Sequence, residues 1–363
     1  MSRRKKQDLT MLLVILFLIS FGLITLYSTS AYNGQVKFHD AAYYFKKQLF
    51  ATILGAILMC GISKMDYHIF EKFAVSGYIC SLLLSTAVLF FGDSYNGSKR
   101  WLSLGPLSFQ PSEFAKLAVI LFLAHIVSSR KKKQTGFGTL IFVMILILPI
   151  VALVGTNNLS TAIIILGIAV ILVFVSNPRY LPFVWIAVTG IGFIAIFLSM
   201  ESYRLDRLKI WRNPEQYEKG YQTIQGLYAI GSGGLFGKGI GHSIQKLGFV
   251  PEAQNDMIFS IICEELGLVG ACILIFVFLI LIWRFMVVAT CAPDLFGSLI
   301  AAGTMGHIAI QVMLNIAVVT NTIPNTGITL PFISYGGTSI LFLMAEMGIA
   351  LSVSRCQKKS FCI

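Results

Sequence analysis

Charged side chains are scarce in this sequence. Only 12% of its 363 residues are Asp, Glu, Lys or Arg, whereas 56% are hydrophobic and the mean hydropathy is +0.80. Soluble domains carry about 25% charged residues. The composition therefore predicts a polytopic membrane protein.

Acidic side chains are the scarcer of the two charged kinds, with 16 Asp and Glu against 28 Lys and Arg, which gives a formal net charge of +12. A basic balance can indicate nucleic acid, but so apolar a chain has little exposed surface for it. We expect the positive charge on loops that face phospholipid headgroups, and no nucleic-acid partner.

Patterns that hold a metal or a nucleotide are also missing. The seven cysteines lack the paired spacing of a zinc site, the five histidines are scattered, and no disulfide framework is indicated. The glycine-rich run at 231–241 has Ser232 where the Walker pattern needs glycine, and Lys238 precedes glycine instead of Ser or Thr. An Asp-x-Asp pair for a metal-bound nucleotide sugar is absent too. We predict neither a structural metal nor a nucleotide site.

Long apolar runs, in contrast, are abundant. The first, about 9–27, follows four basic residues and resembles a signal peptide, but it exceeds a typical signal h-region and is long enough to cross a hydrocarbon core of about 30 Å. We interpret it as an uncleaved span. Further runs lie at about 48–63, 73–91, 112–129, 137–154, 159–176, 181–199, 257–283, 295–320 and 338–354. This pattern predicts an all-α polytopic fold of ten transmembrane helices in one integral membrane domain, residues 1–363.

Basic residues in the short loops predict the orientation. If both termini are cytoplasmic, the basic residues at 3–6, 64, 72, 130–133, 179, 284, 355 and 358–359 all lie inside. The loops on the opposite face are then about 30–47, 92–111, 155–158, 200–256 and 321–337. The largest, 200–256, joins helices 7 and 8.

This large loop is unusually basic for an extracytoplasmic segment. Its basic residues include Arg204, Arg207, Lys238 and Lys246. Because long loops partly escape the charge rule, the loop could be an ordinary solvated surface. The alternative is an anion-binding surface at the membrane interface.

Asp256 lies where this loop meets span eight. A carboxylate at a helix N-terminus is favoured in its ionised form, which suits a general base. Glu252, four residues earlier, would share the same face if the helix started early, and it could share or tune that role. Asp256 could also simply cap the helix.

Two further groups of polar residues fall within apolar spans. Glu264 and Glu265 lie about two turns beyond Asp256, and Glu113 precedes Lys116 by one turn in span four. Intramembrane charges are costly and functional by default. A basic residue on a neighbouring span could satisfy one acid of the first pair. Either an internal salt-bridge network or a substrate-facing cavity would explain the second.

Three loops have a distinct composition. The glycines at 231–241 offer backbone amides, with Lys238, to an anion, or they serve tight turns. The segment 321–337 is rich in Pro, Gly and hydroxyls, which predicts a re-entrant or cavity-lining stretch. The segment 99–113 is interpreted as amphipathic, with Trp101 at headgroup level.

Together these loops resemble the SEDS family (shape, elongation, division and sporulation proteins), most closely its FtsW/SpoVE branch. The resemblance covers nearly the whole chain. It is carried, in the family's order, by Tyr27-Ser28, Lys99-Arg100-Trp101, Gln110-Pro111-Ser112-Glu113 with Lys116, Tyr203-Arg204 with Arg207, Gly220-Tyr221-Gln222 with Gln225, Gly231-Ser232-Gly233-Gly234, Gln245-Lys246, Pro251-Glu252-Ala253, Asp256, Ile258-Phe259, Glu264-Glu265-Leu266-Gly267, and the stretches 326–331 and 334–337.

The resemblance implies ten spans and a peptidoglycan glycosyltransferase that polymerises lipid II outside the cytoplasmic membrane. It places the family's essential aspartate on Asp256. Where the family usually has PEAHTDFIF, this chain has Gln254, Asn255 and Met257 in place of His, Thr and Phe. Asn213 stands at a position where members of the family often have Asp. The presumed base remains, but its surroundings differ.

The implied mechanism needs no nucleotide. Asp256 would take the proton of a lipid II 4-hydroxyl, which attacks C1 of the growing glycan and expels undecaprenyl pyrophosphate with inversion. The candidates for stabilising the leaving charge are Arg100, Lys116, Arg204, Arg207 and Lys246, with or without Mg²⁺ or Mn²⁺. The supporting or substrate-binding candidates are Glu252, Lys238, Glu113, Gln222, Ser334 and Tyr335.

The implied partners are a class B penicillin-binding protein and divisome or sporulation proteins, which would place the chain at a division or sporulation septum. The alternative function is a lipid II flippase, whose translocation path the intramembrane charges would line. A generic transporter would predict an internal repeat, and none is detected between the two halves.

Overall fold

The computed structural model describes residues 7–95, 98–104, 107–129, 137–176 and 208–357. Its principal helices are α1 (Leu9–Phe38), α2 (Tyr43–Lys64), α3 (His68–Lys72), α4 (Ala74–Phe91), α5 (Pro111–Ser129), α6 (Phe137–Asn157), α7 (Leu159–Ser176), α10 (Tyr221–Ser232), α11 (Ile258–Thr290), α12 (Leu295–Val319) and α13 (Gly337–Arg355), with short 3₁₀ turns η2 (Pro214–Gln216) and η3 (Glu218–Gly220).

Nine of the ten predicted spans fall on these helices. Within the described residues, eight helices are long and apolar enough to cross a membrane, and α6 adds a shorter apolar stretch, Ile141–Asn157. The tenth predicted span, 181–199, lies outside the described residues, as do Arg204 and Arg207. The chain is a mostly helical, multi-pass membrane protein; ten spans and their orientation stay predictions.

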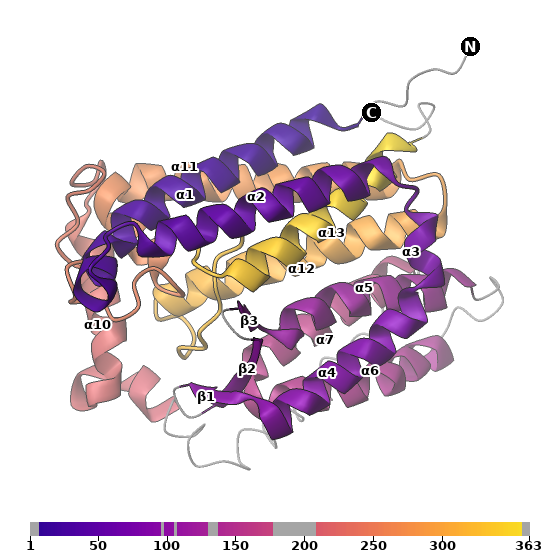
Figure 1. Cartoon of the computed structure of the whole chain (residues 1–363), viewed down its shortest axis with the longest axis horizontal. Helices are drawn as coiled ribbons and strands as arrows, with labels where there is room; N and C mark the ends of the chain where they lie inside the picture. Colours follow the sequence, from indigo (N-terminus) through magenta and orange to yellow (C-terminus); the bar gives the residue numbers. More distant parts are fainter. Residues whose placement is uncertain (1–6, 96–97, 105–106, 130–136, 177–207, 358–363) are drawn as a thin grey trace.

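The long helices lie side by side in two groups (Figure 1). In one group α2 packs against α13, and α11 packs against α1 and α12; in the other α4 packs against α5, and α6 against α7. Contacts of α12 with α5 and α7 join the groups. Large apolar side chains such as Phe50, Leu83 and Phe276 are exposed on the outside, where a bilayer would cover them.

The fold is not entirely helical. Strands β1 (Asp93–Tyr95), β2 (Ser98–Leu104) and β3 (Leu107–Phe109) form an antiparallel sheet in that order. The all-α prediction is therefore wrong at this point, and the amphipathic interpretation of 99–113 stays a prediction. Leu102 pairs with Phe109 and Leu104 with Leu107, and Ser103 separates Leu102 from Leu104 along the chain, which is the period of a strand.

Helix α11 is interrupted at Gly267, whose φ of 68° and ψ of −171° are not helical. The carbonyls of Glu264 and Glu265 accept hydrogen bonds from the N–H groups of Lys238 and Gly239, at 2.9 Å each. In return, the N–H groups at 268 and 269 donate to the carbonyls at 234 and 235. The glycine-rich loop thus replaces the hydrogen bonds that the break removes.

Two glycines permit this close approach. A Cβ on Gly267 would lie 2.4 Å from the nitrogen of Gly237, and a Cβ on Gly237 would lie 2.2 Å from the carbonyl oxygen of Glu265. Both residues also have positive φ, which L side chains rarely adopt. The glycines at 231–241 therefore serve backbone packing against α11.

One cysteine departs from the sequence prediction. Among the described residues, Cys60, Cys80, Cys263 and Cys272 are free, whereas Cys291 is disulfide-bonded. Disulfide formation depends on the distance between two Cα atoms in the folded chain, so cysteine spacing gave no sign of it.

Candidate functional site

A cavity of about 2030 Å³ opens among the loops at one end of the helix bundle. Its lining includes residues from all five segments that the sequence placed on one face of the membrane, among them Tyr44, Arg100, Asn158, Asp256 and Thr329. Pockets for drug-sized ligands are roughly 300–1,000 Å³. This cavity is large enough for a substrate bigger than a drug-sized ligand.

The walls of the cavity differ in polarity. Phe50 and Leu54 of α2, with Leu341 and Phe342 of α13, make an apolar wall, whereas the loops supply charged and amide side chains. Phe50 and Leu54 are also exposed on the outside of the bundle. The lining suits an amphipathic molecule that carries both a polar part and a long apolar chain.

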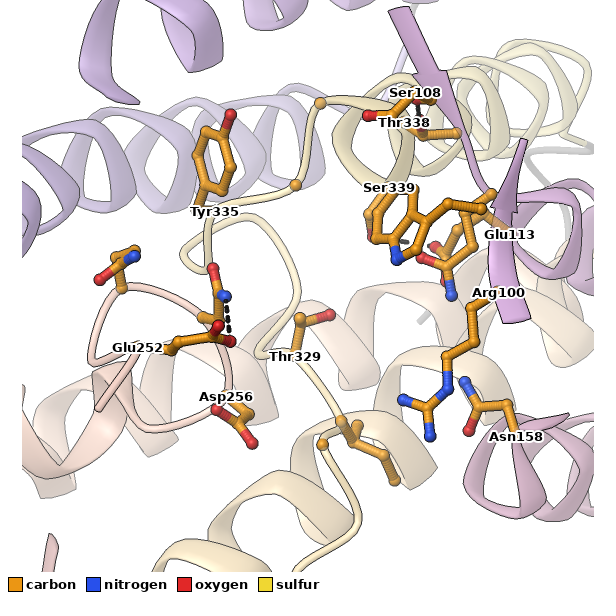
Figure 2. Close-up of a pocket in the computed structure, with 18 of the residues that line it drawn as sticks. Arg100, Ser108, Glu113, Asn158, Glu252, Asp256, Thr329, Tyr335, Thr338 and Ser339 are labelled. Atoms are coloured by element: carbon orange, nitrogen blue, oxygen red, sulfur yellow. Dashed lines mark hydrogen bonds between the residues drawn. The ribbon is translucent and has the colours of Figure 1, made fainter. Parts of the chain in front are cut away.

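Asp256 lies in a turn just before α11, not in the helix. Met257 is the N-cap residue and makes no side-chain capping bond, so the capping interpretation of Asp256 is wrong. The Asp256 side chain is half-buried and accepts a hydrogen bond from Gln222 at 3.3 Å. It lines the cavity (Figure 2).

The pKa of Asp256 is raised from 3.8 to about 6. Burial is the largest cause, and the neighbouring negative charge of Glu252 adds to it. Hydrogen bonds from its own backbone N–H and from Gln222, and the charge of Arg100, act in the opposite direction. The helix N-terminus was expected to keep this group ionised, but desolvation has the larger effect.

Glu252 lies on the same wall as Asp256 but not through helical spacing. Residues 251–257 form turns, and Glu252 has a φ of +48°, so the helix does not start early enough to align the two acids. Asn255 donates to the Glu252 carboxylate at 3.0 Å. The loop itself brings both carboxylates to the cavity (Figure 2).

Arg100, from strand β2, points into the cavity from the other side (Figure 2). Its Nε donates to the carbonyl oxygen of Asn157 at 3.1 Å. Gly327 lies between the two charged groups, because a Cβ there would be 3.8 Å from Arg100 Nη1 and 3.9 Å from Asp256 Oδ2. A carboxylate and a guanidinium therefore face one space across a glycine.

A buried polar network lies deeper in the cavity wall. Lys116 pairs with Glu113 at 3.0 Å and donates to Gln311 at 2.9 Å. His307 lies 2.8 Å from Gln311 and 2.8 Å from Glu346. The internal network is confirmed, and Glu113 and Lys116 also line the cavity; that this cavity faces a substrate stays a prediction.

Lys238 and Lys246 do not line the cavity. Lys238 pairs with Glu264 at 2.6 Å, and Lys246 pairs with Glu265 at 2.6 Å and donates to Ser28 at 2.9 Å. Ser243 also donates to Glu264. Lysines of the large loop, not of a neighbouring span, satisfy the intramembrane acids.

The remaining predicted residues have distinct positions. Gln222 and Tyr335 line the cavity, whereas Ser334 accepts a hydrogen bond from the N–H of Leu330 at 2.8 Å and does not. Burial raises the pKa of Tyr335 to about 12, so its phenol is neutral near pH 7. The segment 321–337 lines the cavity and is free of helix up to Gly336, which confirms its predicted character.

Gln254, Asn255 and Met257, which replace the family's usual residues beside Asp256, are all held in place by the fold. Gln254 accepts a hydrogen bond from Asn33 at 3.0 Å, and its carbonyl accepts one from the N–H of Tyr335 at 2.9 Å. Asn255 binds Glu252, as described above, and Met257 is 1% exposed. They fix the loop that carries Asp256.

Sequence reasoning missed several residues of the cavity. Lys37, Lys46 and Lys47 line its mouth; Lys46 pairs with Asp40 at 2.8 Å. On α12, Gln311 lines the cavity and Asn315 holds two loop carbonyls behind it. These two amides lie four residues apart in an apolar helix, a same-face spacing that could have revealed them.

Comparison with known proteins agrees with this arrangement. The model of the cell cycle protein family that includes FtsW, RodA and SpoVE matches residues 8–359. The chain belongs to this family. Within it, stage V sporulation protein E of Bacillus subtilis is 39% identical over 361 residues, covering 98% of this chain and 98% of the relative.

Two further relatives extend the likeness. A probable peptidoglycan glycosyltransferase FtsW of Trichlorobacter lovleyi is 35% identical over 358 residues, covering 97% of this chain and 94% of that protein. A solved chain of a peptidoglycan synthase complex, described as coordinating polymerization and crosslinking, has a TM-score of 0.81 at 27% identity and covers 98% of this chain and 99% of its own length.

Proposed function

We propose that this chain is a peptidoglycan glycosyltransferase that polymerises lipid II, with Asp256 as the general base. One observation carries the proposal: a half-buried carboxylate with a pKa of about 6 faces a large amphipathic cavity. Within the described residues, no basic side chain forms an ion pair with it. The family and the FtsW relatives support the reaction class.

The carboxylate is suited to its role at neutral pH. A general base works best when its pKa lies close to, but below, the working pH, because it is then ionised and still basic. In the proposed reaction Asp256 accepts the proton of the lipid II 4-hydroxyl as that oxygen bonds to C1 of the growing glycan. The bond from C1 to the pyrophosphate oxygen breaks, with inversion, and undecaprenyl pyrophosphate leaves with the electron pair.

The leaving pyrophosphate needs positive charge. In the described part of the cavity, Arg100 faces the same space as Asp256, and Lys116 lies deeper beside Glu113. Lys47 adds charge at the mouth. We assign the stabilising role to Arg100 first, because its guanidinium faces the same space as the Asp256 carboxylate across Gly327. Arg204 and Arg207 stay candidates from sequence alone.

The apolar wall of α2 and α13 would hold the start of the polyprenyl chain. Because this wall continues to exposed side chains on the outside of the bundle, the chain could extend into lipid while the sugar stays among the loops. This arrangement supports a substrate drawn from the membrane.

The central experiment compares the wild type with Asp256→Asn in glycan polymerisation from purified lipid II, with the partner synthase present. We expect the variant to lose about 10²- to 10⁴-fold in rate, which is the usual contribution of general-base catalysis, while it keeps its melting temperature. Full activity in a folded variant would remove Asp256 from the mechanism.

The same preparations decide the alternative of a lipid II flippase. In sealed vesicles with labelled lipid II, we expect the wild type to polymerise without Asp256-dependent transport. Transport without polymerisation by the wild type would replace the glycosyltransferase with the flippase.

A divalent cation remains part of the proposal. Glu252 and Asp256 could each offer a carboxylate oxygen, and Mg²⁺ or Mn²⁺ would supply Lewis-acid stabilisation of the leaving charge. Within the described residues, no group of three or more His, Cys, Asp or Glu could hold a metal, so such an ion would be shared with the substrate. We expect a chelator to slow polymerisation several-fold and added Mg²⁺ or Mn²⁺ to restore it. An unchanged polymerisation rate in the chelator would show that the reaction does not need a divalent ion.

The proposed partner is a class B penicillin-binding protein, together with divisome or sporulation proteins. The match to a chain of a complex that combines polymerization and crosslinking supports this partnership. The sporulation and FtsW relatives support a site at a septum, which the position of a fluorescent fusion at midcell or at a forespore septum would test.

A further inference from the structure

A single buried amide on α12 contacts the backbone of both loops that form the centre of the cavity. Asn315 is 0% exposed. Its Nδ2 donates to the carbonyl of Asp256 at 2.8 Å and to the carbonyl of Ile328 at 2.7 Å. Both N–H groups of the amide therefore donate hydrogen bonds to loop carbonyls.

The chemistry of the neighbours fixes the orientation of this amide. Two carbonyl oxygens face the same terminal atom, and only the NH₂ group can donate to both. The other terminal atom, Oδ1, is buried without a hydrogen-bond partner among the described residues. The amide therefore satisfies two loop carbonyls while its own oxygen stays unpaired, and an unpaired buried acceptor is unfavourable.

The two carbonyls belong to the two loops that meet beside the reaction space. Asp256 carries the proposed base, and Ile328 follows Gly327, which lies between the carboxylate and the Arg100 guanidinium. Fixing the carbonyl of Asp256 fixes the peptide plane from which its side chain extends. Fixing the carbonyl at Ile328 holds the glycine in place. One side chain thus determines how the base faces the space across from Arg100.

We propose that Asn315 is a positioning residue for Asp256: its amide holds the base-bearing turn against the α12–α13 loop. This inference rests on the proposed function. Its neighbour on the same face, Gln311, makes a parallel contact, donating from Nε2 to the carbonyl of Thr329 at 3.0 Å. Asn315 is the only one of these two amides that reaches Asp256.

The test measures kcat, KM and the pH profile of lipid II polymerisation for Asn315→Leu, which keeps the size of the side chain and removes both donors. We expect kcat to fall about tenfold with KM within twofold. We also expect the acidic limb to move to higher pH, because a loosened turn weakens the hydrogen bonds that favour the ionised carboxylate.

The matched control is Ile308→Ala, which removes packing from another fully buried position on α12. It should lose stability but keep the kcat and the pH profile of the folded protein. If Asn315→Leu keeps the wild-type kcat and acidic limb, or if Ile308→Ala changes both as much, the positioning role is overturned.

Asn315→Asp serves if the leucine variant fails to fold. A carboxylic acid of the same size donates one hydrogen bond at most, so its kcat should lie between those of the wild type and Asn315→Leu, with a displaced acidic limb. Wild-type values in this variant would overturn the proposal. Asp256→Asn is run beside it. An inactive wild type or an active Asp256→Asn would contradict the proposed function itself, whatever Asn315 does.

Discussion

Two pairs of acidic residues, separated by about two helical turns, have opposite surroundings. Glu264 and Glu265 each lie 2.6 Å from a lysine of the large loop. Asp256 forms no ion pair among the described residues, and its neighbour Glu252 raises its pKa further. The first pair holds the broken helix to its loop. The second faces the cavity.

The difference shows how the loop divides its charges. Lys238 and Lys246, which sequence reasoning assigned to an anionic substrate, are used to neutralise acids inside the bundle. Because an isolated charge inside the bundle is costly, Glu264 and Glu265 each keep a lysine of the loop beside them. Within the part of the chain that the structure describes, Asp256 has no such partner, which leaves its carboxylate available for proton transfer.

The largest expected effect concerns the paired region. Lys246→Met leaves Glu265 buried without its cation, and removing one partner of a buried ion pair costs about 3–5 kcal/mol. We expect a large fall in the melting temperature in detergent. Replacing both residues, Lys246→Met with Glu265→Leu, should restore much of the loss, because the uncompensated charge is gone.

Two comparisons accompany this experiment. Lys64→Met, at an exposed lysine of α2, should leave the melting temperature unchanged. Asp256→Asn should not destabilise the protein at pH 7. A carboxyl whose folded-state pKa exceeds its unfolded value favours folding below pH 3.8, and that contribution is lost as the pH rises through about 6. Equal melting temperatures of Lys246→Met and wild type would remove the distinction between the regions.

A smaller effect is expected in the pH profile of the wild type. Because the base must be ionised, the polymerisation rate should rise with pH up to about 6 and level off above it. A limb that stays near pH 4 would mean that burial does not shift Asp256 in the working enzyme.

The smallest expected effect is a shift of the acidic limb of this pH profile in Glu252→Gln. Glu252→Gln removes a negative charge that raises the pKa of Asp256, so the acidic limb should move to lower pH. A shift to higher pH would contradict the assigned electrostatic role of Glu252. No movement would show that the charge of Glu252 does not contribute to the raised pKa.

Much of the fold follows from apolar runs. Nine predicted spans coincide with helices because each run is long enough to cross a bilayer, and length and hydropathy are local properties. The sheet at 93–109 was missed, although the alternation of Leu102, Ser103 and Leu104 carries its period. The tenth span lies outside the described residues.

The candidate site was predicted only in part, and the pattern of success has a physical reason. Asp256, Glu252 and Arg100 lie together because they belong to loops at one end of the bundle, which the order of spans already predicts. The partners of Lys238 and Lys246 depend on the break at Gly267, and the role of Asn315 depends on two carbonyls 59 and 13 residues away. Contacts of this kind have no local signal.

A multi-pass membrane protein, its family and the candidate base Asp256 can all be predicted from the amino-acid order, because hydropathy and motif order are local properties of the chain. Which charges are neutralised and which face the cavity depends on the folded arrangement. Whether a carboxylate lies within 3 Å of a lysine is set by how distant segments pack, and that distance governs both its pKa and its use.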